Sequence, residues 1–427
     1  ALPLIQDDLG LSTIESEIIT SWVTLGALFG ALVAGWMADR LGRRWTAVAA
    51  GLLFAGGALV ETVAPGAGLL TVGRVVVGFG VGLASVVAPL YAAEMSPKTL
   101  RGRFVSTYQL AITVGIFLAY LADDALTSSD RWRLMFALGV IPGVLLVAGF
   151  LAMPESARWL LKVGRRDRAH ESLAKIAGPG EADGQLATIE GELATEAREG
   201  TASWGEVFSP LLRRALIVGV GLAIFQQVTG INAIIYYANE IFAEAGFTTA
   251  EEQAKATLYA VGLVNVLATF VAVAWVDHFG RKPLLFTGLV GMGVSLAAVG
   301  VSFAVLDTSA DTATSTATAG IVTVLALVVF IASFAFSMGP VVWTLISEIY
   351  PNRVRGRAVA VATAVNWGAA FLVTQFFLSI VDAIGESTTF FLFALLCAAA
   401  FVFVWRLVPE TKGRSLEEIQ ADWKAAA

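Results

Sequence analysis

The chain has 427 residues, of which 57% are hydrophobic and 15% are charged, and its formal net charge at pH 7 is −6. Soluble domains average roughly 45–50% apolar and about 25% charged residues, so this composition excludes an ordinary water-soluble fold. The negative net charge and the absence of a basic stripe exclude a nucleic-acid-binding protein. The single cysteine excludes a disulfide within the chain.

Long apolar stretches follow one another along the whole sequence. A helix needs about 20 mostly apolar residues to cross a bilayer. Eleven stretches meet this requirement, near 18–38, 45–63, 69–93, 104–122, 134–153, 214–242, 256–276, 284–306, 320–346, 358–381 and 389–408. They predict an all-α protein that crosses the lipid bilayer many times.

The basic residues fall almost entirely on one side of these predicted spans. Of the 28 Lys and Arg residues, Arg131, Arg133 and Lys255 lie in loops of the other side, and Arg74 lies at the edge of a span. Loops rich in Lys and Arg stay in the cytoplasm. We therefore expect a multi-pass protein of the cell membrane, plasma or inner, with residues 154–212 and the C-terminus in the cytoplasm.

Three phrases occur twice in the same order. They are DRLGRR at 39–44 and DHFGRK at 277–282, EMSPKTLRGR at 94–103 and EIYPNRVRGR at 348–357, and PES at 154–156 and PET at 409–411. Transporters use such internal repeats to place a site between two bundles of helices. The second half contains six predicted spans and the first contains five, so we expect a further helix in front of Ala1, with ALPLI as its last turn.

The repeated charged turns predict salt bridges at the cytoplasmic side. We expect their Arg and Lys side chains to reach carboxylates at neighbouring helix ends, such as Glu94 and Glu348, and to hold the two bundles together. Anchoring by positive charge alone would explain the cations but not the repeated Asp-x-x-Gly-Arg order. The residues of these expected networks are Asp39, Arg43, Arg44, Glu94, Arg103, Glu155, Arg158, Asp277, Arg281, Glu348, Arg357 and Glu410.

Several motifs give the chain a resemblance to the sugar porter family of the major facilitator superfamily, which includes facilitative glucose transporters and bacterial proton–sugar symporters. These motifs lie at 39–44, 73–74, 154–160, 226–232, 236–237, 339–343 and 409–413. The resemblance implies a major facilitator fold, with two six-helix bundles related by pseudo-twofold symmetry. Its expected parts are an N-terminal bundle at 1–153 without its first helix, a cytoplasmic helical linker at 154–212, a C-terminal bundle at 213–408 and a cytoplasmic tail at 409–427.

Polar side chains within the spans are the candidates for a binding site, because burying them in a membrane is costly. A sugar hydroxyl both donates and accepts hydrogen bonds. A neutral carboxamide can pair with both functions, because it has a donor NH₂ and an acceptor oxygen. The residues expected to bind substrate are Gln109, Gln226, Gln227, Asn232, Asn265 and Asn366, with Trp343 and Trp367 stacking on the sugar. All the amides except Asn366 match positions that the resemblance implies for sugar binding. Hydrogen bonding between helices is the alternative role for each amide.

The spacing of two of these amides predicts a break in their helix. On an ideal helix Gln226 and Asn232 point about 240° apart around the axis, so they cannot share a face. Gly230 lies between them. We therefore predict a local distortion that lets both amides meet one ligand and gives Tyr236 and Tyr237 a hinge for gating.

Arg74 is the basic residue expected inside a span. The resemblance implies a role for it in proton coupling, together with an aspartate of the helix expected before Ala1. The sequence has no phosphate-binding loop or metal-ligand spacing, and GFGVG at 78–82 is better explained by close helix packing than by nucleotide binding. We expect no enzymatic activity, no cofactor and no metal.

The predicted function is transport of a monosaccharide by alternating access, through a monomeric carrier. The sugar can be a hexose such as glucose or a pentose, carried by proton symport or by facilitated diffusion. Two alternatives remain at this point: a sugar sensor that does not transport, and an efflux carrier for another small solute.

Overall fold

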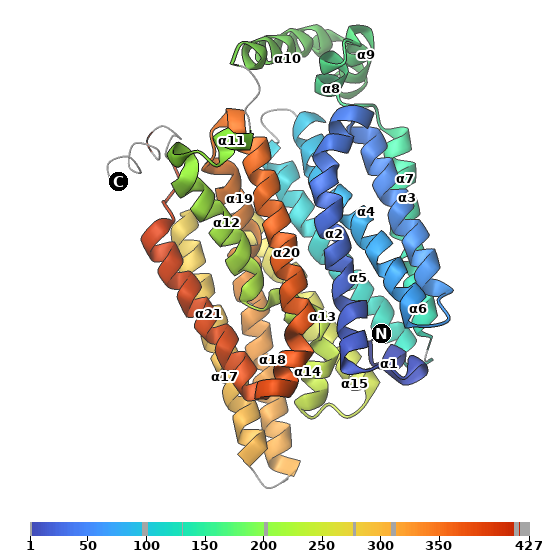
Figure 1. Ribbon diagram of the computed structural model, residues 1–427, viewed down its shortest axis with the longest axis vertical. Helices are drawn as coiled ribbons and strands as arrows, with labels where there is room; N and C mark the ends of the chain where they lie inside the picture. Colours follow the sequence, from blue (N-terminus) through green and yellow to red (C-terminus); the bar gives the residue numbers. More distant parts are fainter. Residues whose placement is uncertain are drawn as a thin grey trace.

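The computed structural model describes residues 2–95, 101–129, 131–199, 204–275, 279–308, 313–413 and 418. The regular structure of these residues is helical throughout (Figure 1). Eleven helical segments of this described part are long and apolar enough to cross a membrane, which confirms the predicted spans. The protein is therefore an all-α, multi-pass membrane protein.

The first half of the chain forms one bundle of helices. Its elements are α1 (Leu2–Leu9), α2 (Thr13–Leu41), α3 (Arg43–Thr62), α4 (Ala67–Met95), α5 (Arg101–Thr127), α6 (Trp132–Leu138) and α7 (Val140–Ala152). Glycines let α2 and α4 approach closely, because a Cβ at Gly78 would lie 2.0 Å from the backbone oxygen of Val23 and one at Gly82 would lie 2.1 Å from that of Ala27. The GFGVG stretch thus serves helix packing, as predicted.

Short helices connect the two halves. They are α8 (Ala157–Lys162), α9 (Arg166–Ala177), α10 (Pro179–Glu199), α11 (Trp204–Val207) and the 3₁₀ turn η1 (Pro210–Leu212). Trp159, Leu160, Leu173 and Leu186 form a small hydrophobic core among α8, α9 and α10. These three helices lie together at one end of the molecule, which we call the linker end (Figure 1).

The second half forms the other bundle. Its elements are α12 (Arg213–Val228), α13 (Ile231–Tyr236), α14 (Ala238–Glu244), α15 (Ala250–Ala256), the π-helix η2 (Thr257–Leu263), α16 (Val264–Trp275), α17 (Arg281–Thr308), α18 (Ala313–Phe336), α19 (Met338–Glu348), α20 (Asn352–Ile384) and α21 (Glu386–Leu407). Two of its spans are interrupted, one between α12 and α13 and one between α18 and α19. A large hydrophobic core fills this half, and the interruptions lie within it.

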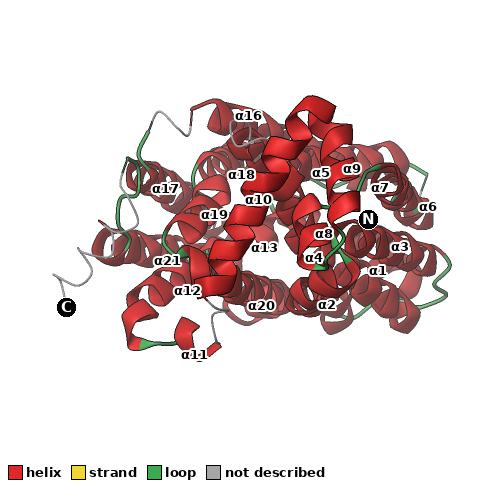
Figure 2. Cartoon of the chain, turned by 90° about the horizontal axis from the view of Figure 1, so that it is seen from above, coloured by secondary structure: helices red, strands yellow, loops and turns green. Residues whose placement is uncertain are grey.

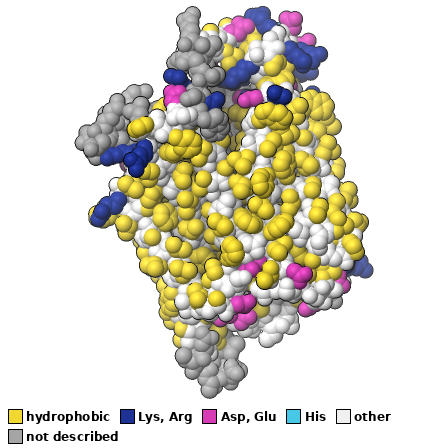
Figure 3. All heavy atoms as spheres, viewed as in Figure 1, with side chains coloured by type: hydrophobic (Ala, Val, Ile, Leu, Met, Phe, Trp, Pro, Cys, Tyr) yellow, Lys and Arg dark blue, Asp and Glu magenta, His cyan; other side chains and the backbone are white. Residues whose placement is uncertain are grey.

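The two bundles stand side by side, with their interface formed mainly by α2 against α20 and by α5 against α16 (Figure 2). A broad hydrophobic band covers the visible face of the molecule between its two ends (Figure 3). Lys and Arg side chains on this face gather toward the linker end, whereas Asp and Glu side chains are seen both there and at the opposite end, which we call the far end. This is the surface of a protein embedded in a bilayer.

Candidate functional site

The helix break predicted between Gln226 and Asn232 is present. Thr229 ends α12, and Gly230, with φ of 98°, adopts the left-handed conformation before α13 begins. A side chain at Gly230 would be strained by this φ, and its Cβ would lie 3.2 Å from the ring of Phe393. The break turns the following segment, so that residues from both sides of it meet.

Four of the predicted amides form one chain of hydrogen bonds. Asn232 Nδ2 donates to Gln227 Oε1 at 2.7 Å, and Gln227 Nε2 donates to Asn366 Oδ1 at 3.1 Å. Asn366 Nδ2 in turn donates to Gln226 Oε1 at 2.8 Å. We call Gln226, Gln227, Asn232 and Asn366 the amide cluster; it joins α12, α13 and α20.

The cluster is buried and anchored to the backbone. Gln226, Gln227 and Asn366 are 3%, 6% and 5% exposed, and Asn232 is half-buried. Gln226 Nε2 donates to the carbonyl of Met338 at 2.7 Å, and Asn366 Nδ2 also donates to that of Ala223 at 2.9 Å. In this structure the amides therefore form hydrogen bonds between helices, which was the alternative role considered for them.

Gln109 of the first half lies beside Gly339 of α19, across the interface. A Cβ at Gly339 would lie 3.7 Å from Gln109 Nε2, and Gln226 Nε2 lies 3.4 Å from the Gly339 carbonyl. Because Gly339 has no side chain, the half-buried Gln109 lies close to this residue, whose carbonyl is also within reach of Gln226. The three other predicted contacts, Asn265, Trp343 and Trp367, lie on α16, α19 and α20, outside the hydrogen-bonded cluster as the described residues record it.

The predicted gating tyrosines have different surroundings. Tyr237 is fully buried, donates its hydroxyl to the carbonyl of Thr374 at 2.7 Å and stacks on Phe377 with ring centroids 5.1 Å apart. Tyr236 is 37% exposed. Beside them, Tyr120 of α5 donates to the carbonyl of Ile235 at 2.8 Å, and this bond joins the first half to α13.

Further polar contacts join the two halves at the far end. Glu17 of α2 accepts hydrogen bonds from both the backbone N–H and the hydroxyl of Ser379, each at 2.7 Å. Ser21 donates to Gln375 Oε1 at 2.7 Å. We call these contacts and the Tyr120–Ile235 bond the far-end closure. Glu17 was not among the residues predicted from the sequence, although its position beside the charge-free run of a span was a usable signal.

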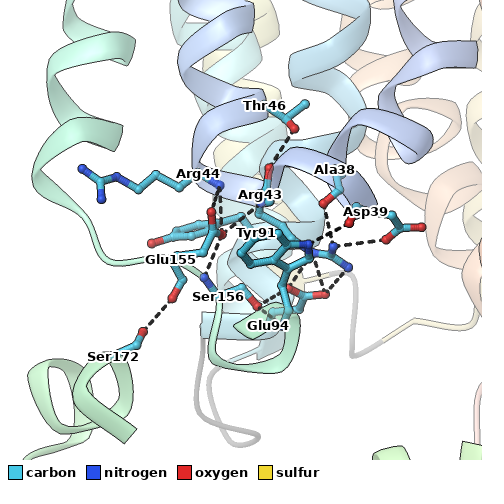
Figure 4. A network of polar contacts seen from close by, with 12 residues as sticks. Ala38, Asp39, Arg43, Arg44, Thr46, Tyr91, Glu94, Glu155, Ser156 and Ser172 are labelled. Carbon is cyan, nitrogen blue, oxygen red and sulfur yellow. Dashed lines mark hydrogen bonds and ion pairs between the residues drawn. The ribbon is translucent and has the colours of Figure 1, made fainter. Parts of the chain in front are cut away.

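At the linker end, the predicted charge networks are present in both halves, and Figure 4 shows that of the first half. Arg43, which is 3% exposed, donates from Nε to Glu94 Oε2 at 3.0 Å and from Nη1 to Asp39 Oδ1 at 3.1 Å. In the second half, Arg281 pairs with Glu348 at 3.1 Å. The prediction that these bridges hold the two bundles together is wrong: α2, α3 and α4 belong to one bundle, so the Arg43 network ties helices within a half.

The PES and PET motifs complete these networks. Glu155 Oε1 accepts the backbone N–H groups of Arg43 and Arg44 at 3.0 and 3.1 Å, and so caps the first turn of α3 (Figure 4). Glu410 does the same for α17, accepting the N–H groups of Arg281 and Lys282, each at 3.0 Å. The side chains that follow also correspond: Ser156 donates to Glu94, and Thr411 donates to Glu348.

These contacts set the charge state of Glu410. Partial burial raises its pKa, but backbone N–H donors, including those of Lys412, Lys282 and Arg281, more than offset this and hold the pKa below its ordinary value of 4.5.

The remaining predicted members of the charge networks are Arg158, Arg103, Arg357 and Asp277. Arg158 pairs with Glu192 of α10 at 3.0 Å, within the linker. Arg103 lies on α5 and Arg357 on α20. Asp277 lies outside the described residues.

Two bundles of membrane-spanning helices, with a buried cluster of neutral amides in the second bundle, are the arrangement expected of a membrane transporter. The sequence matches the family model "Sugar (and other) transporter" over residues 5–423. It is 38% identical over 421 residues to the galactose-proton symporter of Escherichia coli (strain K12), covering 98% of this chain and 88% of that protein. It is 36% identical over 428 residues to the D-xylose transporter of Levilactobacillus brevis, covering 100% of this chain and 91% of that one.

The fold agrees with these relatives. The xylose transporter XylE from E. coli, solved in its inward open conformation, superposes with a TM-score of 0.81 at 31% identity, over 99% of this chain and 94% of XylE. The chain belongs to the sugar transporter family and has the major facilitator fold that the sequence predicted. It is thus a member of a family of carriers.

Proposed function

We propose that this protein carries a monosaccharide, a hexose such as glucose or a pentose, across the cell membrane by proton symport. The amide cluster is the observation that carries the proposal. Each of its carboxamides offers a donor and an acceptor. The hydrogen bonds described above satisfy both functions of Gln226, Gln227 and Asn366 and the donor of Asn232, with other amides and backbone carbonyls as partners. Sugar hydroxyls can replace those partners one for one, so binding leaves no buried polar group without a hydrogen bond.

The proposed sugar site includes residues of both halves. Gln226, Gln227, Asn232 and Asn366 bind hydroxyls from the second half, and Gln109 does so from the first. Asn265 adds a further amide, and Trp343 and Trp367 stack on the sugar ring. All of these residues belong to one chain, which supports a carrier that works as a monomer.

We also propose that the linker end faces the cytoplasm, with boundaries between the parts at 153, 212 and 408. The position of Lys and Arg supports this orientation. The far-end closure then seals the outer side, so the described arrangement is an inward-facing state. Its similarity to the inward open form of XylE supports this assignment. Gly230, Tyr236 and Tyr237, beside the Tyr120–Ile235 bond, form the moving part of the outer gate.

Counterflow in proteoliposomes tests this proposal. Vesicles loaded with one unlabelled sugar are diluted into the same labelled sugar, and a panel of hexoses and pentoses is compared with and without a pH gradient. We expect accumulation of at least one monosaccharide and faster net uptake when the outside is acidic. Binding without counterflow would favour a sensor, and counterflow of a non-sugar solute alone would favour the efflux carrier.

A further inference from the structure

A groove lies between η2 and α18, in the part of the second half that is near the far end. α15, which leads into η2, lies toward that end (Figure 1). The groove has a volume of about 440 Å³. Ligand sites commonly measure about 300–1,000 Å³, so it is large enough for one arm of an amphiphilic ligand. None of the residues proposed to bind sugar lines it.

The walls of the groove are apolar and follow the direction of the spans. Ala256 and Ala260 lie about one turn apart on one wall, and Val324 and Val328 lie one turn apart on the other. The small side chains of the two alanines leave the space between the walls open. Tyr259 flanks the groove and is 60% exposed, so the groove opens toward the lipid. An apolar groove with this direction fits an acyl chain.

Two charged side chains, Glu252 and Lys255, line the outer end of the groove. Both are exposed, and both precede η2 in the chain, so they lie nearer the far end than the apolar walls. Glu252 Oε2 accepts hydrogen bonds from the backbone N–H of Thr249 at 3.3 Å and from the hydroxyl of Thr248 at 3.5 Å. Its Oε1 accepts none within the described part of the chain. One carboxylate oxygen and one ammonium group are therefore available to a ligand.

The order of these groups matches one class of phospholipid. From the far end inward, the groove presents the Glu252 carboxylate, then the Lys255 ammonium about one turn deeper, then apolar walls. Phosphatidylethanolamine presents an ammonium group, then a phosphate, then acyl chains, so each of its charges meets the opposite one. A lipid with a phosphate alone would place an anion beside two acids, Glu251 and Glu252. The quaternary ammonium of phosphatidylcholine has no N–H to donate to Glu252.

The groove is joined to the proposed gate through η2. On another side of η2, a Cβ at Gly262 would lie 2.8 Å from the ring of Tyr120. Tyr120 in turn donates to the carbonyl of Ile235, in one of the bonds of the far-end closure. π-helical turns occur frequently at functional sites. A ligand that packs between η2 and α18 therefore also fixes the surface that Tyr120 contacts.

We propose that this groove binds one phospholipid whose headgroup carries a primary ammonium group, such as phosphatidylethanolamine. Lys255 binds the phosphate, Glu252 accepts a hydrogen bond from the headgroup ammonium, and one acyl chain lies between η2 and α18. The bound lipid stabilises η2 and, through Tyr120, the far-end closure. This inference does not depend on the proposed sugar transport.

The test measures lipid binding to the purified full chain. Phosphatidylethanolamine, phosphatidylcholine and phosphatidylglycerol with the same acyl chains are titrated into delipidated protein, and native mass spectrometry gives the Kd of the first bound lipid. Wild-type protein should bind phosphatidylethanolamine most tightly. Lys255→Ala should weaken its binding by roughly two- to fivefold, the range of an exposed ion pair, and Glu252→Gln should remove the preference over phosphatidylcholine. Ala256→Leu, which fills the groove, should weaken binding of all three lipids.

Lys175→Ala is the matched control, because Lys175 is an exposed lysine of α9 in the linker, away from the groove. This variant should bind all three lipids as wild type does. Equal affinity of wild-type protein for the three lipids, or a preference for phosphatidylglycerol, would overturn the proposal. Wild-type affinities in Lys255→Ala and Ala256→Leu would show that the lipid binds elsewhere, and this outcome leaves the sugar site untouched.

Discussion

Replacing Gln227 with Ala tests the sugar site most directly. Gln227 is 6% exposed and makes two side-chain hydrogen bonds, accepting from Asn232 at 2.7 Å and donating to Asn366 at 3.1 Å. The substitution removes one donor and one acceptor from the proposed sugar contacts and leaves Asn366 Oδ1 buried without this partner. A buried polar group left unsatisfied costs about 1–3 kcal/mol.

The same range applies to binding. If a sugar hydroxyl replaces one of these partners, Gln227→Ala should weaken sugar binding by about 1–3 kcal/mol, which is roughly 5- to 150-fold in Kd at about 1.4 kcal/mol per factor of ten. Isothermal titration calorimetry on purified protein gives the Kd, and counterflow gives the half-saturating sugar concentration. Asn232→Ala should act in the same direction.

Gln253→Ala is the matched control. Gln253 is another buried glutamine, 8% exposed, whose Nε2 donates to the carbonyl of Phe247 at 2.9 Å, but it lies on α15 outside the cluster. This variant should lose a comparable amount of stability and keep its sugar affinity. Unchanged affinity in both Gln227→Ala and Asn232→Ala, or equal weakening in Gln253→Ala, would refute the site assignment.

Three further predictions concern the helix break, the charged caps and the far-end closure. Gly230→Ala should lower the free energy of unfolding by about 1–3 kcal/mol, because φ there is 98°, and an unchanged melting temperature would contradict this. The pKa of Glu410 is lower in the folded protein than its ordinary 4.5, so its stabilising effect is complete above that pH and is lost as pH falls further. Glu410→Gln should therefore flatten the acid dependence of the melting temperature, and a curve parallel to wild type would refute the assignment. Glu17→Gln weakens the two bonds to Ser379, so it should favour the outward-facing state; labelling of a cysteine placed at the outer gate should then be faster, and equal labelling rates would exclude this role.

Several features of the fold follow from local sequence, because their causes are local. Every backbone polar group in lipid must be hydrogen-bonded within a helix. The thickness of the bilayer then fixes the length of that helix and its apolar content, so a span can be recognised from the sequence. The break at Gly230 follows from helix periodicity, as two amides that face opposite directions cannot serve one ligand on a straight helix. The recurring PES and PET motifs predicted that Glu155 and Glu410 belong to charged networks, but not that they cap helices 112 and 129 residues away in the sequence.

Other features depend on pairs that are distant in sequence. Sequence reasoning selected Gln226, Gln227 and Asn366 as polar residues of spans, but only the packing of α12 against α20 shows which amide donates to which. The assumption that the Arg43 network joins the bundles was wrong, because a charged side chain reveals its own capacity for pairing but not which helix lies next to it. Arg74 was recognised as the basic residue of a span, whereas its pairing with Glu61 required coordinates.

The sequence alone determined that this is a helical membrane protein with two related halves, and it identified the candidate amides and Arg74 within the spans. Those properties come from hydropathy, charge and repetition, each of which can be recognised in the order of residues along the chain. The tertiary structure decided how the amides bond to one another, which polar groups join the two halves at the far end and that Glu61 lies against Arg74. These depend on the approach of helices far apart in sequence, and that approach is set by glycine contacts and by the packing of whole bundles.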